Sequence, residues 1–213
     1  MKQANETVQT QHLASDAPGA IAAAAALIQA GSVVAFPTDT VYGIGANAFD
    51  GDAVMRLFEV KERPFDKGIP ILLAELDHIH QVARDIPDAA MAMIERFWPG
   101  PLTLIVPKRS DLPAIISPND GIAVRIPDCD VARRVISAAG GAVAASSANR
   151  SGHAPAVSGI EALADLNGLI AAVIDHGISP GGVASTIVDC RGSTPRIVRE
   201  GPISANMLSL ATT

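Results

Sequence analysis

Apolar and polar stretches alternate along the chain in a way that predicts interleaved strands and helices. Short runs rich in Val and Ile are typical of strands, and apolar residues at i, i+3 and i+4 are typical of helices. Strands are expected at 32–36, 69–73, 102–106, 122–126, 142–145, 172–175, 185–189 and 196–199. Helices are expected at 18–30, 50–64, 77–83, 87–97 and 129–139, and after Ser158. This interleaving predicts an α/β fold.

The pattern also predicts the domain organisation. Residues 1–16 are polar and are expected to form a flexible N-terminal tail, and residues 17–213 are expected to form a single domain, because no repeat or linker divides them. With 213 residues, of which 48% are hydrophobic, the chain is long enough for a substantial core. The apolar run Ile21–Ile28 is too short for a membrane span, so a cytoplasmic protein without a membrane anchor is expected.

Composition narrows the classes of function. The chain has 16 Lys+Arg and 22 Asp+Glu, for a formal net charge of −6, which argues against a broad basic surface for nucleic acid. Direct RNA binding through a local basic cluster stays open. Cys129 and Cys190 are too few for a disulfide framework, and neither has a CxxC partner that would indicate a zinc site.

A polar segment follows the first predicted strand. Thr38, Asp39, Thr40 and Tyr42 lie between Pro37 and a glycine pair. These groups either satisfy local backbone atoms in a tight loop or form a ligand site at the end of a buried strand. The glycines also fit a G-x-G-x-x-A dinucleotide fingerprint, which would indicate an NAD(P)-dependent oxidoreductase. That fingerprint requires glycines in a strand-to-helix turn, and six residues separate Gly43 from Phe36.

Cationic side chains supply further candidates. Lys61, Arg63 and Lys67 surround Pro64 at what is expected to be an exposed helix end. They are either solvated cations that favour the helix dipole or a clamp for phosphate groups. Arg125 is flanked by apolar residues on a predicted strand. Its charge must therefore be paired in the core or directed at an anion in a cleft, and its planar guanidinium suits a carboxylate.

In combination, these segments resemble the YrdC-like family of threonylcarbamoyl-AMP synthases. The resemblance extends from about Ala20 to Pro202 and rests on seven motifs in a fixed order. They begin at Phe36 (FPTDTVYG), Lys61 (KERP), Pro99 (PGPLT), Val124 (VRIP), Ser147 (SANRSG), Ser185 (STIVD) and Arg199 (REG).

The resemblance implies a fold and an activity. The fold would be a twisted open mixed sheet with flanking helices and a substrate cleft on one face, in a short single-domain form. The activity would be that of a nucleotidyltransferase, which makes threonylcarbamoyl-AMP and pyrophosphate from L-threonine, bicarbonate and ATP, with Mg²⁺. The product would serve threonylcarbamoyladenosine modification of tRNA, completed by a separate transferase complex that the protein would contact transiently. The alternative is a YrdC-like module that binds RNA or nucleotide without synthase activity.

The resemblance also implies roles for individual residues, with no metal ion held by the protein itself. Lys61 and Arg63 would be catalytic. L-threonine would contact Thr40, Arg125, Ala145 and Ser185. ATP would contact Arg63, Lys67, Ser147, Asn149 and Arg199. The chain departs from the family pattern at Leu72, where a His is usual, after Lys67, and at Pro155.

Overall fold

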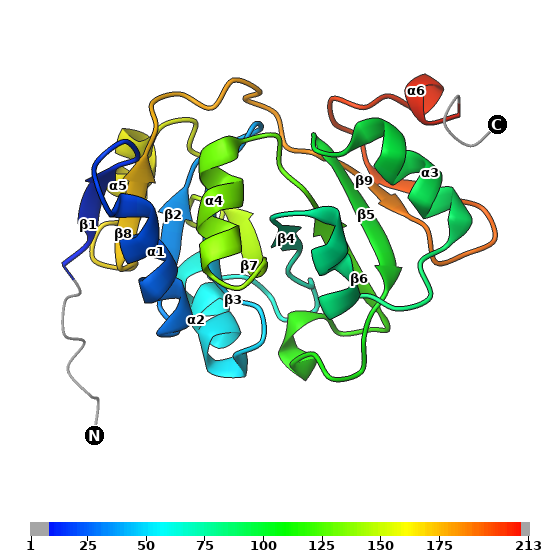
Figure 1. Cartoon of the computed structure of the whole chain (residues 1–213), viewed down its shortest axis with the longest axis horizontal. Coiled ribbons are helices and arrows are strands. Elements are labelled where there is room, and N and C mark those ends of the chain that lie inside the picture. The colour runs from blue at the N-terminus through cyan, green and yellow to red at the C-terminus, as the bar shows by residue number, and fades with distance from the viewer. Residues whose placement is uncertain (1–8, 210–213) are drawn as a thin grey trace.

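The computed structural model describes residues 9–209, which form a single ten-stranded sheet with helices on both faces (Figure 1). The strand order is β1-β8-β2-β3-β7-β4-β6-β5-β9-β10. The strands are β1 (Gln11–Ala14), β2 (Val34–Phe36), β3 (Gly43–Asn47), β4 (Ile71–Leu73), β5 (Leu102–Pro107), β6 (Gly121–Arg125), β7 (Ala142–Ser147), β8 (Ala172–Asp175), β9 (Thr186–Asp189) and β10 (Arg196–Arg199). Parallel and antiparallel pairs alternate irregularly across the sheet, so the expected mixed α/β architecture is confirmed.

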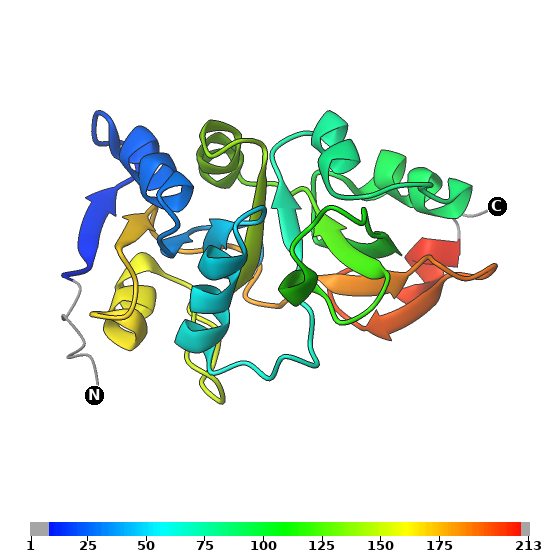
Figure 2. The same cartoon turned by 90° about the horizontal axis from the view of Figure 1, so that it is seen from below.

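The helices divide between the two faces of the sheet. In Figure 2, α1 (blue) and α4 (olive green) lie on one side, and α2 (cyan) and α5 (yellow) lie on the other. The helices of the described residues are α1 (Ala20–Gln29), α2 (Gly51–Lys61), α3 (Asp88–Phe97), α4 (Asp130–Ala138), α5 (Gly159–Leu166) and α6 (Ala205–Ser209), with 3₁₀ helices η1 (Leu76–Gln81) and η2 (Ala114–Ile116). Within this range, no helix is both long and apolar enough to cross a membrane.

The two faces of the sheet bury separate hydrophobic clusters. Successive side chains of a strand point to opposite faces. Along β7, Ala142 and Ala144 accordingly belong to the cluster that includes α2 and α5, and Val143 and Ala145 belong to the cluster that includes α1 and α4. Because β7 is buried on both sides, its last residues are fixed in position, and they carry polar side chains into the cleft described below.

Helix ends follow the expected local signals. The Asp50 side chain accepts hydrogen bonds from two backbone N–H groups of the first turn of α2, and Ser158 caps α5 by accepting from the Glu161 N–H. Helix α2 ends at Lys61, and its C-cap residue Glu62 has a positive φ of 48°, two residues before Pro64. The chain therefore reverses directly after Lys61, and this reversal places the KERP segment against β7 and the loop that follows it.

The segment Gly43–Asn47 is a strand that the sequence pattern did not predict. It pairs antiparallel with both β2 and β7. A Cβ at Gly45 would lie 2.6 Å from Val143 Cγ1 and 2.7 Å from the Phe36 ring, so the glycine allows close cross-strand packing. Gly43 and Gly45 are thus part of a β-strand and not of a strand-to-helix turn, and the dinucleotide fingerprint does not apply.

The expected N-terminal tail is wrong in part. Gln11–Ala14 forms β1, an edge strand that pairs in parallel with β8, and residues 1–8 lie outside the described residues. Side chains hold this edge in place. His12 Nε2 lies 2.9 Å from Asp175 Oδ2, and Ser15 Oγ lies 2.7 Å from His176 Nδ1. The strand forms because its backbone pairs with a segment that is distant in sequence, which a local pattern does not reveal.

One long connection crosses the molecule. Residues 176–185, here called the strap, join β8 near one edge of the sheet to β9 near the other (Figure 1). Tyr42, which is fully buried, holds the beginning of the strap, because its hydroxyl donates to Gly177 O (2.8 Å) and accepts from His176 N–H (2.9 Å). Burial raises the pKa of Tyr42 to about 12, so the phenol stays protonated.

Candidate functional site

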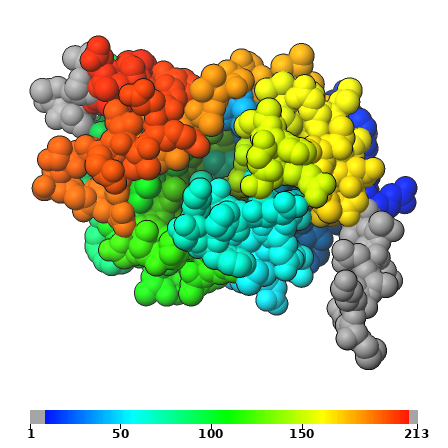
Figure 3. Space-filling view, turned by 180° about the vertical axis from the view of Figure 1, so that it is seen from behind, coloured from blue at the N-terminus to red at the C-terminus, as the bar shows by residue number. Residues whose placement is uncertain are grey.

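A cleft of about 260 Å³, lined by both apolar and polar side chains, lies where the two halves of the sheet meet. Figure 3 shows the hollow on one face, bordered by the cyan segments around α2, the yellow segments after β7 and the orange segments around β9 and β10. Seven of the ten predicted catalytic and substrate-binding residues line it: Thr40, Arg63, Arg125, Ala145, Ser147, Ser185 and Arg199. They come from segments far apart in the sequence, so the fold assembles one site from most of the motifs.

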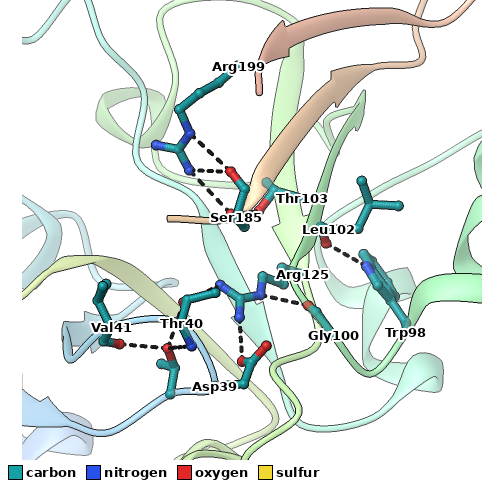
Figure 4. Close-up of polar contacts among 11 residues, drawn as sticks. Asp39, Thr40, Val41, Trp98, Gly100, Leu102, Thr103, Arg125, Ser185 and Arg199 are labelled. Carbon is teal, nitrogen blue, oxygen red and sulfur yellow. Dashed lines mark hydrogen bonds and ion pairs between the residues drawn. The ribbon is translucent and has the colours of Figure 1, made fainter. Parts of the chain in front are cut away.

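Arg125 ends β6 and is buried, with its guanidinium held from three directions (Figure 4). Its Nε donates to Gly100 O at 2.9 Å, its Nη1 donates to Thr40 Oγ1 at 3.0 Å, and its Nη2 pairs with the Asp39 carboxylate. Burial lowers the pKa of Arg125, and Asp39 opposes that effect. The guanidinium has five N–H groups, and two of them have no partner among the contacts of the described residues. Arg125 is therefore paired in the core, as one of the two sequence interpretations states, and it also lines the cleft. Binding of an anion by Arg125 stays a prediction.

Ser185 and Arg199 lie on the opposite wall of the cleft. Arg199 Nε and Nη2 donate to Ser185 O at 3.0 and 2.8 Å, and Nη2 also lies 3.2 Å from Ser185 Oγ. Gly201 brings the end of β10 close to this point, because a Cβ there would lie 2.5 Å from Ala184 O and Thr186 N. Arg199 is thus fixed in position by a backbone contact that only glycine permits.

Arg63 faces Arg199 across the cleft. Its side chain is half-buried and donates to Lys67 O at 3.0 Å and to Gly68 O at 2.8 Å, so it also shapes the turn after Pro64. Burial, and then the positive charge of Arg199, lower the pKa of Arg63. Among the described residues that line the cleft there is no Asp or Glu, so this end of the cleft carries a positive charge suited to an anionic ligand.

Lys61 differs from its sequence interpretation. The helix end was expected to be exposed, but Lys61 is 6% exposed and its ammonium lies beneath the cleft. Its Nζ donates to Ser147 O (2.8 Å), Asn149 O (2.5 Å) and Asn149 Oδ1 (2.7 Å), and lies 3.3 Å from Ser147 Oγ. Burial, and then Arg63, lower the pKa of Lys61 to about 8. Lys61 is buried because of a tertiary contact, in which the loop after β7 folds over the end of α2.

Two further predicted residues lie outside the lining of the cleft. Lys67 is exposed on the turn after Pro64. Asn149 is buried beside Lys61, and its Nδ2 donates to Arg150 O at 2.9 Å and to His153 O at 2.7 Å. Asn149 therefore fixes the course of the loop after β7. Ser147, the last residue of β7, reaches the cleft.

The departures from the family pattern fall on the cleft itself. Leu72 and Pro155 both line it, so apolar side chains occupy these positions. Sequence reasoning gave no role to Asp39, which pairs with Arg125, or to Thr103, which lies 2.8 Å from Ser185. Both belong to quoted motifs, FPTDTVYG and PGPLT. The density of polar residues in the first motif was the available signal for Asp39, and Thr103 is the single polar side chain of the second.

Metal-binding groups are scarce in this region. In residues 9–209, no group of three or more His, Cys, Asp and Glu side chains is arranged to hold a metal ion.

Comparison with known proteins adds independent information. The profile of the Sua5/YciO/YrdC family, which carries the description "Telomere recombination", matches residues 26–201. The threonylcarbamoyl-AMP synthase of Pyrococcus abyssi is 42% identical over 179 residues, which are 84% of this chain and 53% of that protein. The threonylcarbamoyl-AMP synthase of Bacillus subtilis is 38% identical over 201 residues, which are 93% of this chain and 58% of that protein.

A solved structure has the same fold. The crystal structure of P. abyssi Sua5 complexed with L-threonine has a TM-score of 0.88 and 37% sequence identity, and the match covers 96% of this chain and 60% of that one. The chain thus spans about half the length of the curated relatives it matches.

Proposed function

Because the chain belongs to the Sua5/YciO/YrdC family, we propose that it is a nucleotidyltransferase that makes threonylcarbamoyl-AMP and pyrophosphate from L-threonine, bicarbonate and ATP. The observation that carries this proposal is the polarity of the cleft. A buried guanidinium with two free N–H groups lies at one end, and two guanidiniums face each other at the other end without a carboxylate in the lining. One end suits an amino-acid carboxylate, and the other suits a polyphosphate.

L-Threonine would bind at the Arg125 end. Its carboxylate would take the two free N–H groups of the guanidinium, whose orientation is already fixed by Gly100 O, Thr40 and Asp39. Ala145 and Leu72 would pack against the side chain, since both line the cleft, and Ser185 would contact the substrate from the other wall. The structure of P. abyssi Sua5 complexed with L-threonine supports this assignment.

The reaction requires no nucleophile from the protein. The α-amine, after release of its ammonium proton to solvent, adds to the carbon of bicarbonate and water leaves. A carbamate oxygen then attacks the α-phosphorus of ATP, and the bond to the β-phosphate breaks to release pyrophosphate. The protein would contribute by holding the two reactants in line and by stabilising the charge on the phosphates.

Arg63 and Arg199 are the groups suited to stabilise that charge, because both line the cleft and face each other. Lys67 would reach the outer phosphates from its exposed turn. Lys61 would act through others as a positioning residue, because its ammonium holds the backbone and side-chain oxygens of Ser147 and Asn149. Mg²⁺ would arrive as part of the substrate, bound to ATP, since the lining among the described residues offers no carboxylate ligands.

The product would feed threonylcarbamoyladenosine modification of tRNA, through transient contact with a transferase complex. That role would place the protein in the cytoplasm, where tRNA and ATP are available. The alternative is a module with the same cleft that binds RNA or nucleotide and makes no adenylate.

Pyrophosphate release from ATP tests the proposal. With bicarbonate present, each amino acid is supplied in turn, and release that requires both threonine and bicarbonate is the expected result. Arg63→Ala should reduce release strongly, and Arg134→Ala, an exposed arginine on α4 paired only loosely with Asp130 at 3.8 Å, is the matched control. Absence of release with every amino acid, together with stabilisation by RNA or ATP, would refute the synthase and favour the binding module.

A further inference from the structure

Two buried hydroxyl groups form a pair on the wall of the cleft. Thr103 Oγ1 lies 2.8 Å from Ser185 Oγ, and the two residues are 3% and 5% exposed. Thr103 comes from β5 and Ser185 from the end of the strap, and both line the cleft. Figure 4 shows the pair between the guanidinium groups of Arg125 and Arg199. The two arginines are close enough for the charge of Arg199 to lower the pKa of Arg125.

The pair carries two hydroxyl protons, and only one of them has an acceptor in the protein. Each hydroxyl carries one proton and two lone pairs. One proton is shared between Thr103 and Ser185, whichever of them donates, and Arg199 Nη2 adds a further donor at 3.2 Å from Ser185 Oγ. Among the contacts of the described residues, neither oxygen has an acceptor for the second proton. Since both side chains line the cleft, that O–H is available to an acceptor atom of a ligand.

On the opposite wall, the hydroxyl that faces the cleft acts as an acceptor and not as a donor. Thr38 Oγ1 donates to Val41 O at 2.6 Å, so the 2.9 Å contact between Thr38 and Thr40 must use the proton of Thr40. Thr40 Oγ1 also accepts from Arg125 Nη1 at 3.0 Å. Thr40 therefore has no proton left for a ligand and is able only to accept. The Thr103–Ser185 pair is the hydroxyl donor among these residues.

We propose that Thr103 is a further positioning residue of the reaction and that the Thr103–Ser185 pair donates a hydrogen bond to a carbamate oxygen formed on the amine of threonine. This inference rests on the proposed function. With the threonine carboxylate at Arg125 and the phosphates at Arg199 and Arg63, the carbamate lies between them, which is where the pair is found. The pair also becomes a stronger donor because Arg199 donates into Ser185 Oγ, and each bond in such a chain polarises the next.

Thr103→Val and Thr103→Ser test the role, because the first removes only the hydroxyl and the second keeps it. In Thr103→Val we expect pyrophosphate release to fall by about ten- to a hundredfold at saturating threonine, as for loss of one hydrogen bond to a charged group. The rise in melting temperature produced by threonine alone, without bicarbonate, should be unchanged. Thr103→Ser should restore release. The control is Thr10→Val, which removes a hydroxyl that bonds Ile170 O and Gly168 N–H at the far edge of the sheet.

The outcomes separate this inference from the proposed function. Absence of threonine-dependent release in the wild type would overturn both. Normal release in Thr103→Val, or a defect that Thr103→Ser does not restore, would overturn the role of Thr103 alone. A defect confined to threonine binding would also overturn it, because the pair would then contact the hydroxyl or carboxylate of threonine rather than the carbamate.

Discussion

The buried ammonium of Lys61 should make the stability of the protein depend on pH. Its pKa falls from an ordinary value of 10.5 to about 8 in the folded protein. Between these values the unfolded chain binds a proton that the folded protein has lost, so the free energy of unfolding rises with pH. One pKa unit corresponds to about 1.4 kcal/mol, so a shift of this size contributes about 3 kcal/mol. That contribution is complete above pH 10.5 and is lost as the pH falls through 8.

Comparison with Lys61→Met isolates this effect. Other groups titrate in the same range, since burial raises the pKa of the Cys190 thiol to about 12 and thereby lowers stability as the pH rises. Such contributions are the same in both proteins and cancel in the difference. Urea titrations at several pH values between 7 and 10.5 should show the wild type gaining about 3 kcal/mol relative to the variant. Met also leaves the oxygens around Nζ without a donor, but that cost does not vary with pH.

Lys67→Met provides the control, because it removes an exposed lysine from the same motif. Its stability should differ from that of the wild type by less than about 0.5 kcal/mol. If the difference between the wild type and Lys61→Met stayed constant from pH 7 to 10.5, burial of the ammonium would not depress its pKa and the reasoning would fail.

Three substitutions test other parts of the cleft. Arg125→Lys should raise the KM for threonine by about 10- to 100-fold with little effect on the KM for ATP, because the planar pair of N–H groups is lost; an unaltered threonine KM would contradict its role. Tyr42→Phe should lower the free energy of unfolding by about 1–3 kcal/mol in a calorimetric melt, because Gly177 O loses its donor. A melting temperature equal to that of the wild type would contradict the anchoring of the strap. Gly201→Ala should destabilise by about 1–3 kcal/mol and raise the KM for ATP, because its Cβ clashes with the backbone around Ser185; an intact KM would separate β10 from nucleotide binding.

The sequence predicted elements that carry their own signal. Apolar periodicity and caps located α2 and α5, and β8 has the predicted bounds, because these segments bury apolar residues in the core. Strand β10 also has the predicted bounds, although most of its residues are exposed. Strand β3 was missed since Gly43 and Gly45 lack the β-branched character of a strand, and their presence reflects contact with Phe36 and Val143. Strand β1 was missed because its stability comes from β8, which is distant in sequence.

The sequence predicted which residues form the candidate site better than it predicted where those residues lie in the structure. Lys61 was expected at an exposed helix end, but its burial depends on Ser147 and Asn149, which are 86 and 88 residues away. No local pattern contains that information. Arg125 was easier to interpret, because a charge within an apolar strand admits few physical solutions.

The length of the strap limits how the two walls of the cleft are able to move apart. Seven inter-strand spacings separate β8 from β9, or about 34 Å measured along the sheet, and the chain from Asp175 to Thr186 reaches at most about 40 Å. The strap therefore links the edge that carries β1 to the strand that begins beside Ser185 with a chain whose full extension only slightly exceeds the path along the sheet. Lengthening the strap and shortening it should therefore differ in their effect on stability and on the cleft. Added residues cost little, because loop-closure entropy grows slowly, whereas removal of a few residues would pull Ser185 away from Thr103.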